Sequence, residues 1–403
     1  MTNLPQGWEV KKLGEIGEIV TGSTPSKSNL DFYGKDYPFF KPSDFEQGYF
    51  LENAGDNLSK LGFDKARQLP PKTILVVCIG SLGKVALTRV IGSCNQQINA
   101  IIPHKNIIAE YIYYYCISSK FQSILFSKAP QTTLAILNKT EFSKLEIIYP
   151  KDIKEQERIV GILDFAFSKI DENIKKAKEN LANIDELMQS ALQKAFNPLN
   201  DNTKENYQLP QSWEWKSLGD TSNYGKTSQV KPSQLKGNDW ILELEDIEKE
   251  SGVLLQKVLF QDRQSKSNKI KFNKGDILFG TLRPYLKKVI IADDNGACSS
   301  EIMPFSTGNS ITNHFIYYYL FANFLHDRIS SLTYGARMPR LGTKDGKSLQ
   351  IPLPPLQEQE QIAEHLDFVF EKAKALKELY TKELKDYEEL KQSLLDKAFK
   401  GEL

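Results

Sequence analysis

Short polar loops in both halves of this 403-residue chain carry the side chains that could bind a ligand. Lys and Arg bind phosphates, whereas Gln, Asn, Ser, Thr and Tyr can hydrogen-bond to base edges. The candidates in the first half are Lys41, Ser43, Lys84, Gln96, Gln131, Thr132, Asn138 and Lys139. The candidates in the second half are Lys226, Gln229, Arg263, Lys266, Arg283, Tyr285, Lys287, Arg337 and Arg340. For any one of these residues, an ordinary solvent-exposed position without a binding role is as good an explanation as DNA contact. Their matched placement in the two halves is what favours DNA contact.

The usual catalytic motifs are absent from the sequence. Residues 342–348 (Gly-Thr-Lys-Asp-Gly-Lys-Ser) place three residues between the glycines where a P-loop has four, so we predict a polar loop. A methyltransferase acting on base amino groups needs a turn like Asn-Pro-Pro-aromatic, which Asn197-Pro198-Leu199 does not match. The acidic stretches 243–246 and 248–250 are predicted to form a solvated edge. We therefore expect a chain that is not an enzyme.

Metal and redox sites are not predicted either. The four cysteines lack the short paired spacing of a zinc site, and the four histidines form no i,i+4 pair, so we expect buried free thiols and no metal. No apolar run approaches the roughly 20 residues of a membrane span. The first residues do not resemble a secretory signal, so the expected location is the cytoplasm.

Charge is nearly balanced along the chain. Lys plus Arg outnumber Asp plus Glu by 16 to 13 in residues 1–150 and by 20 to 17 in residues 197–350. The ratio is 8 to 9 in residues 151–196 and 8 to 12 in residues 351–403. A protein that grips nucleic acid alone is usually more basic. If DNA is bound, another protein is expected to neutralise part of the phosphate charge.

The chain consists of two copies of one repeat, which predicts a duplicated architecture. Three pairs of segments show it: residues 4–14 and 209–219, residues 155–167 and 358–370, and residues 192–196 and 395–399. The framework segments agree, while the intervening loops have diverged. Two similar scaffolds are therefore expected to carry two different sets of loops.

A stripe of apolar residues with three- and four-residue steps predicts one long helix in each copy. In the first copy the stripe runs from Ile159 to Ala195, with an extra four-residue step at 170–174. In the second it runs from Ile362 to Ala398 and includes Leu376 and Leu390. Each helix should span about 38 residues, roughly 57 Å. The two helices are expected to pack as an antiparallel coiled coil and to act as a rigid spacer.

The predicted fold class is α+β, with two similar mixed α/β domains separated by the two helices in a pseudo-twofold arrangement. The predicted boundaries are a first recognition domain at 1–150, a first helix at 151–197, a linker at 198–208, a second recognition domain at 209–350 and a second helix at 351–403.

The repeated motifs resemble those of the specificity subunits of type I restriction–modification enzymes. The resemblance lies in the Leu-Pro-x-x-Trp-Glu opening, found twice, in Pro354-Pro355-Leu356-Gln357-Glu358-Gln359 before the second helix, and in the ending Lys397-Ala398-Phe399-Lys400-Gly401-Glu402-Leu403. The corresponding motifs of the first copy are looser. The resemblance covers essentially the whole chain.

This resemblance implies a DNA-recognition subunit of a host-defence complex. Each target-recognition domain would read one half of a bipartite double-stranded DNA site, and the helices would set the gap and dock two methyltransferase subunits. Restriction and translocase subunits would join them. S-adenosylmethionine, ATP and Mg would be bound by those partners and none of them by this chain. Lys84, Lys139, Arg283 and Arg340 are assigned to DNA on side-chain chemistry and loop position alone.

A different class of function fits the same repeat. A duplicated coiled-coil protein could be a protein-interaction scaffold, such as an anti-restriction or assembly factor. Copurification separates the two interpretations, because a specificity subunit should bring down a methyltransferase and bind a specific duplex only in its company.

Overall fold

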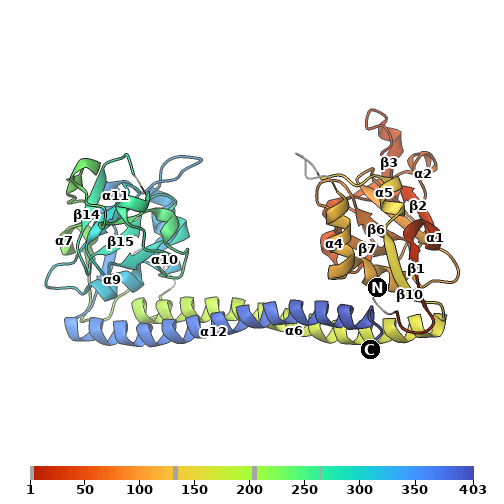
Figure 1. Cartoon of the computed structure of the whole chain (residues 1–403). Coiled ribbons are helices and arrows are strands. Elements are labelled where there is room, and N and C mark those ends of the chain that lie inside the picture. The colour runs from red at the N-terminus through yellow and green to blue at the C-terminus, as the bar shows by residue number, and fades with distance from the viewer. Residues whose placement is uncertain (1–3, 130–134, 202–206, 264) are drawn as a thin grey trace. The chain divides into compact units, whose positions relative to one another are not determined.

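The computed structural model describes residues 4–129, 135–201, 207–263 and 265–403 (Figure 1). The chain divides into two compact units. Unit 1 comprises Met1–Ala177 and Thr381–Leu403, and unit 2 comprises Lys178–Tyr380. Each unit therefore contains one globular α/β domain and part of both long helices. This is the predicted α+β fold, and the two units repeat the same arrangement.

The globular domain of unit 1 contains a five-stranded sheet in the order β2-β9-β6-β7-β4. Its strands are β2 (Gly17–Thr21), β4 (Phe50–Leu51), β6 (Ile74–Val77), β7 (Val85–Thr88) and β9 (Ile98–Pro103). All four side chains of the central strand β6 are buried, as expected for an Ile-Leu-Val-Val run. This strand thus anchors the loop that follows it.

Smaller elements complete the first domain. A three-stranded sheet has the order β5-β3-β8, and β1 pairs antiparallel with β10. These strands are β1 (Trp8–Lys12), β3 (Tyr33–Phe40), β5 (Asp56–Leu58), β8 (Ser93–Cys94) and β10 (Glu146–Pro150). The helices are α1 (Leu13–Ile16), α2 (Lys60–Lys65), α3 (Ala109–Ile117), α4 (Ser119–Lys128) and α5 (Lys139–Ser143), with 3-10 turns η1 (Leu30–Phe32) and η2 (Pro42–Gln47).

The globular domain of unit 2 has a four-stranded sheet, β12-β14-β17-β13, and a three-stranded sheet, β16-β15-β18. The strands are β12 (Gln229–Val230), β13 (Trp240–Leu242), β14 (Lys269–Phe272), β15 (Ile277–Gly280), β16 (Val289–Ile291), β17 (Gly296–Cys298) and β18 (Ile302–Phe305). As in unit 1, a terminal pair, β11 (Glu214–Ser217) and β19 (Gln350–Leu353), is antiparallel.

The helices of the second domain follow the same order along the chain as those of the first. They are α7 (Leu218–Thr221), α8 (Phe260–Arg263), α9 (Asn313–Tyr319), α10 (Asn323–Leu332) and α11 (Thr343–Lys347), with 3-10 turns η3 (Pro232–Gln234), η4 (Leu244–Asp246) and η5 (Pro284–Leu286).

The long helices α6 (Ile153–Phe196) and α12 (Leu356–Ala398) have 44 and 43 residues and so exceed the predicted length of about 38. They pack antiparallel within each unit. In unit 1, Lys391 Nζ lies 2.6 Å from Asp171 Oδ1, and Arg158 Nη2 donates to Leu403 O at 2.8 Å. In unit 2, Ile184 and Met188 pack with Ala373.

Two predicted seam positions of α12 are wrong, because Leu376 and Leu390 are 41% and 46% exposed. Leu395 and Phe399 are buried instead. A stripe counted from sequence cannot separate helix–helix contact from contact with a globular domain, and Phe399 packs edge-on against Tyr111 and Tyr115 of α3. Phe196 packs in the same way against Phe315 and Tyr319 in unit 2.

A buried glutamine at the start of each long helix fixes it to its own domain. The Gln156 side chain accepts from Ile108 N at 2.9 Å and donates to Pro150 O at 2.9 Å and Asn106 O at 3.4 Å. The Gln359 side chain accepts from Thr312 N at 3.0 Å and donates to Pro354 O at 2.8 Å and Ser310 O at 3.0 Å. The same three bonds therefore orient each domain on its helix.

The four cysteines are free and buried, as expected. Among the described residues, no helix is long and apolar enough to span a membrane.

Candidate nucleic-acid interface

Three loops of unit 1 meet where the central strand β6 ends. Cys78 N donates to Gln97 O at 2.8 Å, which joins the loop after β6 to the turn before β9. Leu137 N donates to Cys78 O at 2.9 Å, which brings in the segment before α5. We call residues 79–84, 95–97 and 135–139 the first loop cluster.

The same three loops meet in unit 2, at the end of β15. Thr281 N donates to Glu301 O at 2.8 Å, and Leu341 N donates to Thr281 O at 3.0 Å. Arg283 N donates to Pro339 O at 2.7 Å, so the segment before α11 lies against the loop after β15. We call residues 282–288, 299–301 and 334–340 the second loop cluster. The matched placement predicted from the sequence is thus a shared backbone framework.

The two clusters differ in the residue types at their left-handed backbone positions. In the first cluster Gly80 and Gly83 have φ values of 81° and 89°. In the second cluster the corresponding residues are Arg283 and Lys287, with φ values of 50° and 45°. A residue with a Cβ is disfavoured in this region, and such positions gather at functional sites. The second cluster therefore retains side chains at positions where the first uses glycine.

Most predicted residues of the second cluster are accessible. Arg283, Tyr285 and Arg337 are exposed and Arg340 is partly buried. The Arg340 backbone exchanges two hydrogen bonds with Tyr334, which folds residues 334–340 into a tight loop. The loops thus bring three guanidinium groups and a phenol onto one framework, a set suited to phosphates and base edges.

Lys287 does not fit the predicted role of DNA contact. Its side chain is buried, and its ammonium group donates to Phe321 O at 3.1 Å and to Asn323 Oδ1. Burial lowers the pKa of Lys287. The sequence places this lysine in a polar loop but does not reveal that its side chain is turned into the domain. Lys287 is therefore not part of the interface.

Residues of the first cluster are more often engaged with their own domain. Asn138 caps α5 by accepting from Glu141 N at 2.9 Å, and Lys139 beside it is exposed. Gln96 is exposed and accepts from Thr24 Oγ1 at 2.5 Å. Lys84 Nζ lies 3.6 Å from Glu46 Oε1. Gln131 and Thr132 lie outside the described residues.

The other predicted residues lie outside both clusters. Lys41 forms an ion pair with Asp56 near the exposed Ser43. Lys226, which precedes β12, and Gln229, in β12, are exposed. Lys266 is exposed just before β14.

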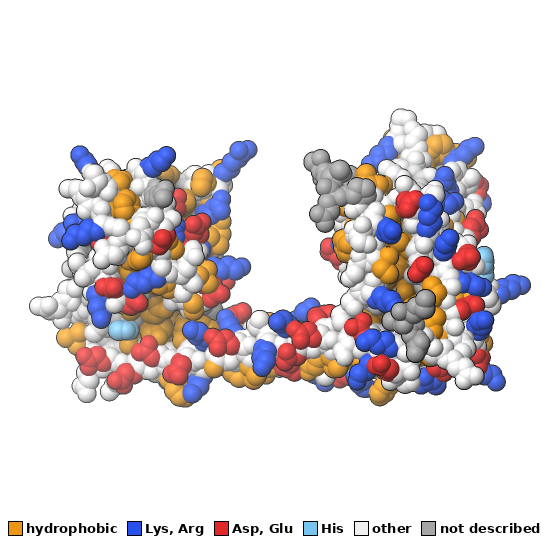
Figure 2. All heavy atoms as spheres, viewed as in Figure 1, with side chains coloured by type: hydrophobic (Ala, Val, Ile, Leu, Met, Phe, Trp, Pro, Cys, Tyr) orange, Lys and Arg blue, Asp and Glu red, His pale blue; other side chains and the backbone are white. Residues whose placement is uncertain are grey.

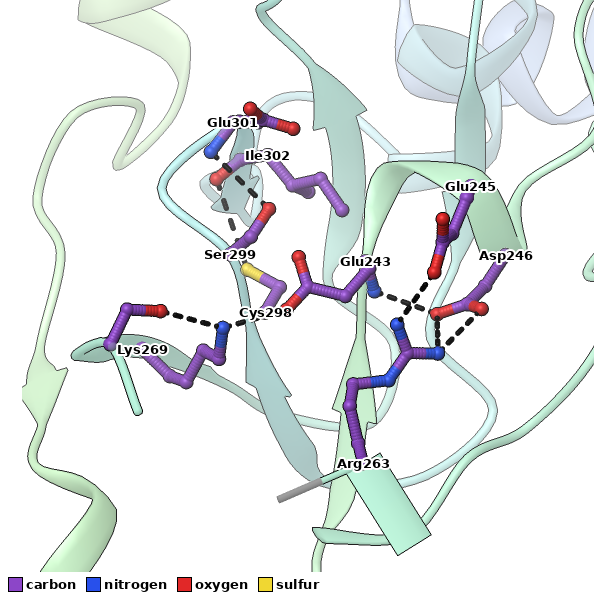
Figure 3. Close-up of polar contacts among 10 residues, drawn as sticks. Glu243, Glu245, Asp246, Arg263, Lys269, Cys298, Ser299, Glu301 and Ile302 are labelled. Carbon is purple, nitrogen blue, oxygen red and sulfur yellow. Dashed lines mark hydrogen bonds and ion pairs between the residues drawn. The ribbon is translucent and has the colours of Figure 1, made fainter. Parts of the chain in front are cut away.

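Arg263 belongs to a buried ion-pair network in unit 2 (Figure 3). Its Nη2 donates to both carboxylate oxygens of Asp246 at 2.7 and 2.8 Å, and Asp246 is fully buried. Lys269 is also buried, and its Nζ lies 2.6 Å from Glu243 Oε1. The predicted solvated edge at 243–246 is therefore wrong for Glu243 and Asp246, because basic residues more than 15 positions away neutralise them. Arg263 is held by its own domain and does not face a ligand.

Two exposed residues near the predicted sites had not been selected from the sequence. Tyr334 is 60% exposed in the second cluster, and Asn268 is exposed beside Lys266. Both stand in loops that the sequence marks as divergent. That divergence is the signal that could have identified them.

Lys and Arg side chains line the edge of each globular domain that lies away from its helices (Figure 2). Within the described residues, no group of three or more His, Cys, Asp or Glu side chains could hold a metal ion. The exposed side chains of the two clusters offer positive charge and hydrogen-bonding groups.

Comparison with known proteins agrees with this arrangement. The family model described as "Type I restriction modification DNA specificity domain" matches residues 5–183 and again residues 210–385. The specificity subunit of the type I restriction enzyme HindI from Haemophilus influenzae is 39% identical over 176 residues. That match spans 42% of this chain and 38% of the relative, and a match to the MjaIX specificity subunit of Methanocaldococcus jannaschii spans 52% of that relative.

Other relatives match along their length. The EcoDI specificity subunit of Escherichia coli is 23% identical over 424 residues, which cover 99% of this chain and 89% of the relative. Among solved structures, a chain from a study of complex assembly and conformational transition of the type I R-M system has a TM-score of 0.78 at 20% identity, with both chains fully covered. The HsdS subunit of Thermoanaerobacter tengcongensis has a TM-score of 0.54 at 20% identity, over 99% of this chain and 98% of that one. With both halves matched by the same family model, this chain belongs to the type I restriction–modification DNA specificity family.

Proposed function

We propose that this chain is the DNA-recognition subunit of a type I restriction–modification complex. Each globular domain reads one half of a bipartite double-stranded DNA target through its loop cluster. The observation that carries the proposal is that two similar frameworks hold different residues at matched positions, as with Gly80 and Arg283. The shared framework positions each domain on the DNA, and the side chains on it determine which bases are recognised.

The chain performs no catalysis in this proposal. Modification subunits bring S-adenosylmethionine and methylate adenine, and restriction subunits bring ATP, Mg and the nuclease. The balanced charge supports such a division, because the net formal charge of +1 is small for a protein that would hold DNA alone. The partners then supply part of the positive surface around the duplex.

Matched apolar residues on the long helices support the docking of two identical partners. Phe165 on α6 and Phe368 on α12 are 70% and 60% exposed and occupy equivalent positions of the repeat. Leu187 and Leu390 are a second equivalent pair, and both are exposed. Each unit thus has one Phe and one Leu of these two matched pairs exposed on its helices. Large exposed apolar side chains repeated in this way indicate a protein contact made twice.

Copurification of the full chain with its modification subunit tests this proposal. We expect two copies of the partner per chain, one copy after Phe165→Asp or Phe368→Asp, and none after both. Leu379→Asp is the matched control, because Leu379 is as exposed as these residues but its counterpart in α6 is Lys176. Native mass spectrometry counts the copies.

DNA binding is measured on the same complex. The complex should bind one specific duplex, with affinity falling steeply as salt rises. A chain that retains no methyltransferase and shifts no specific duplex would instead be a scaffold.

A further inference from the structure

We propose that residues 265–268, which lead into β14, form an additional DNA-contacting loop of unit 2 whose shape is set by two ion pairs. In this proposal Lys266 and Asn268 contact DNA, whereas Arg263 and Lys269 are positioning residues. The inference rests on the proposed function and extends it to a segment outside the two loop clusters.

The ion pairs fix both ends of this segment (Figure 3). On one side, a single nitrogen of Arg263, Nη2, donates to both carboxylate oxygens of the buried Asp246. Asp246 also accepts from Gln256 Nε2 at 2.8 Å. On the other side, the buried Lys269 bonds to Glu243 at 2.6 Å. Glu243 N donates to Asp246 Oδ2 at 2.8 Å, so the two pairs form one network. Hydrogen-bonded charge pairs that are shielded from water hold their geometry more firmly than exposed ones.

Three of the described residues between these anchors face solvent. Lys266, Ser267 and Asn268 are all exposed. Ser267 Oγ lies 3.0 Å from Lys269 Nζ, which ties the loop to its anchor. Lys suits a phosphate, and the Asn amide can donate to and accept from an adenine edge at the same time.

The loop lies next to the second loop cluster. Strand β14 pairs antiparallel with β17 so that Ile270 faces Cys298, and residues before 270 therefore run beside the turn 299–301. The sheet that carries β14 packs through two clusters of buried residues that contain no residue of the long helices. The loop is thus in the layer of the domain away from the helices.

A purely structural role is the alternative, and the first domain argues against it. Its corresponding buried carboxylate, Asp44, accepts from the backbone N–H groups of Lys41 at 2.7 Å and Gly55 at 3.0 Å. Backbone donors are therefore enough for this fold at that position. Unit 2 adds the pair of Arg263 with Asp246. Its pair of Lys269 with Glu243 stands where unit 1 pairs Lys41 with Asp56, and the two pairs frame a divergent polar loop.

The test uses the full chain with its modification subunit and a duplex that contains both half-sites. Lys266→Ala should lower the affinity at all sequences and reduce the slope of log affinity against log salt by roughly one. Asn268→Ala should relax discrimination at one base pair of a single half-site by roughly fivefold or more. Both substitutions are at exposed positions, so folding is expected to be retained.

The positioning role is tested with Lys269→Met, which replaces a buried ammonium by an apolar side chain of similar length. We expect a loss of specific affinity comparable to that of Asn268→Ala, and no additional loss when both substitutions are combined, because both act through one loop. Lys257→Ala is the control, since it removes a positive charge that pairs with Asp293 and Asp294 in the same domain.

Specific binding that is unchanged in Lys266→Ala and Asn268→Ala would overturn the inference. Additive losses in the combined variant would overturn the positioning role. If the unmodified complex binds no specific duplex at all, the proposed function fails instead, so the two failures are distinguishable.

Discussion

The two globular domains make the same contacts with the long helices but carry different side chains in their loops. In unit 1, Gln122 Nε2 donates to Cys116 O at 2.6 Å and to Gly83 O at 2.9 Å. In unit 2 the equivalent residue is His326, whose Nε2 lies 2.6 Å from Leu320 O, and the buried Lys287 stands in place of Gly83. One framework bond is thus made by an amide in one domain and by an imidazole in the other.

This difference shows which parts of the fold tolerate change. Attachments to the long helices keep their residue types, as in the bond from Tyr114 to Asp164 at 2.7 Å and the bond from Tyr318 to Asp367. The packing beneath the loop clusters keeps its bonds but changes its side chains. Among the described residues, the exposed ends of the loops share neither hydrogen bonds nor side chains between the two domains. The difference between the two domains therefore increases with distance from the helices. This is expected if the exposed loops determine which bases are recognised and the helices hold the globular domains in place.

The largest expected change comes from lengthening the helices. Inserting four residues at the 170–174 step of α6 and at the equivalent step of α12 adds about 6 Å of helix, roughly two base pairs of DNA. We expect both half-sites to persist while the gap between them grows, as shown by mapping methylated sites. An unchanged gap would contradict the role of the helices as a spacer.

Removing a buried glutamine should destabilise one unit strongly. Gln156→Ala and Gln359→Ala each delete three hydrogen bonds to backbone groups, one of them fully buried, and we expect each to lower the free energy of unfolding by about 3–5 kcal/mol. Hydrogen exchange should show the loss in unit 1 for Gln156→Ala and in unit 2 for Gln359→Ala. Gln357→Ala, at an exposed position of the same helix, should change stability by less than about 0.5 kcal/mol.

Acid should weaken unit 2 more than unit 1. Burial lowers the pKa of His326 from its ordinary value of 6.5 to about 4, and His326 Nδ1 is buried without a partner. The pKa of His326 is lower in the folded state than in the unfolded state. The contribution of neutral His326 to the free energy of unfolding is therefore complete above pH 6.5 and is lost as the pH falls towards 4, by about 3 kcal/mol in total. His326→Gln copies Gln122 and should remove this pH dependence, measured by hydrogen exchange between pH 7 and pH 4. An equally steep loss in the variant would rule out His326 as the cause.

Arg283→Gly should separate stability from binding. Glycine relieves the left-handed backbone, so the free energy of unfolding should stay the same or rise by up to about 1 kcal/mol. Loss of the guanidinium should reduce affinity for the DNA site roughly tenfold. Chemical denaturation and binding titrations measure the two effects. A variant that is less stable yet binds normally would show that Arg283 has a structural role.

The sequence was sufficient for the repeated framework and insufficient for the loop tips. Repeated segments and apolar periodicity predicted two mixed domains and two long helices, because these features depend on local pattern. The inward turn of Lys287, the pairing of Arg263 with Asp246 and the exposure of Leu390 depend on contacts between residues distant in sequence. Side-chain type identified residues that can bind DNA, but only the fold shows which of them are already paired within the protein.

The central claim is that each globular domain reads one half of a bipartite site. The most direct measurement is to replace residues 209–350 with the corresponding domain of a relative and to map methylated adenines in cells that also express the modification subunit. We predict that one half-site changes while the other half-site and the gap stay the same. A change in both half-sites, or in neither, would contradict the account.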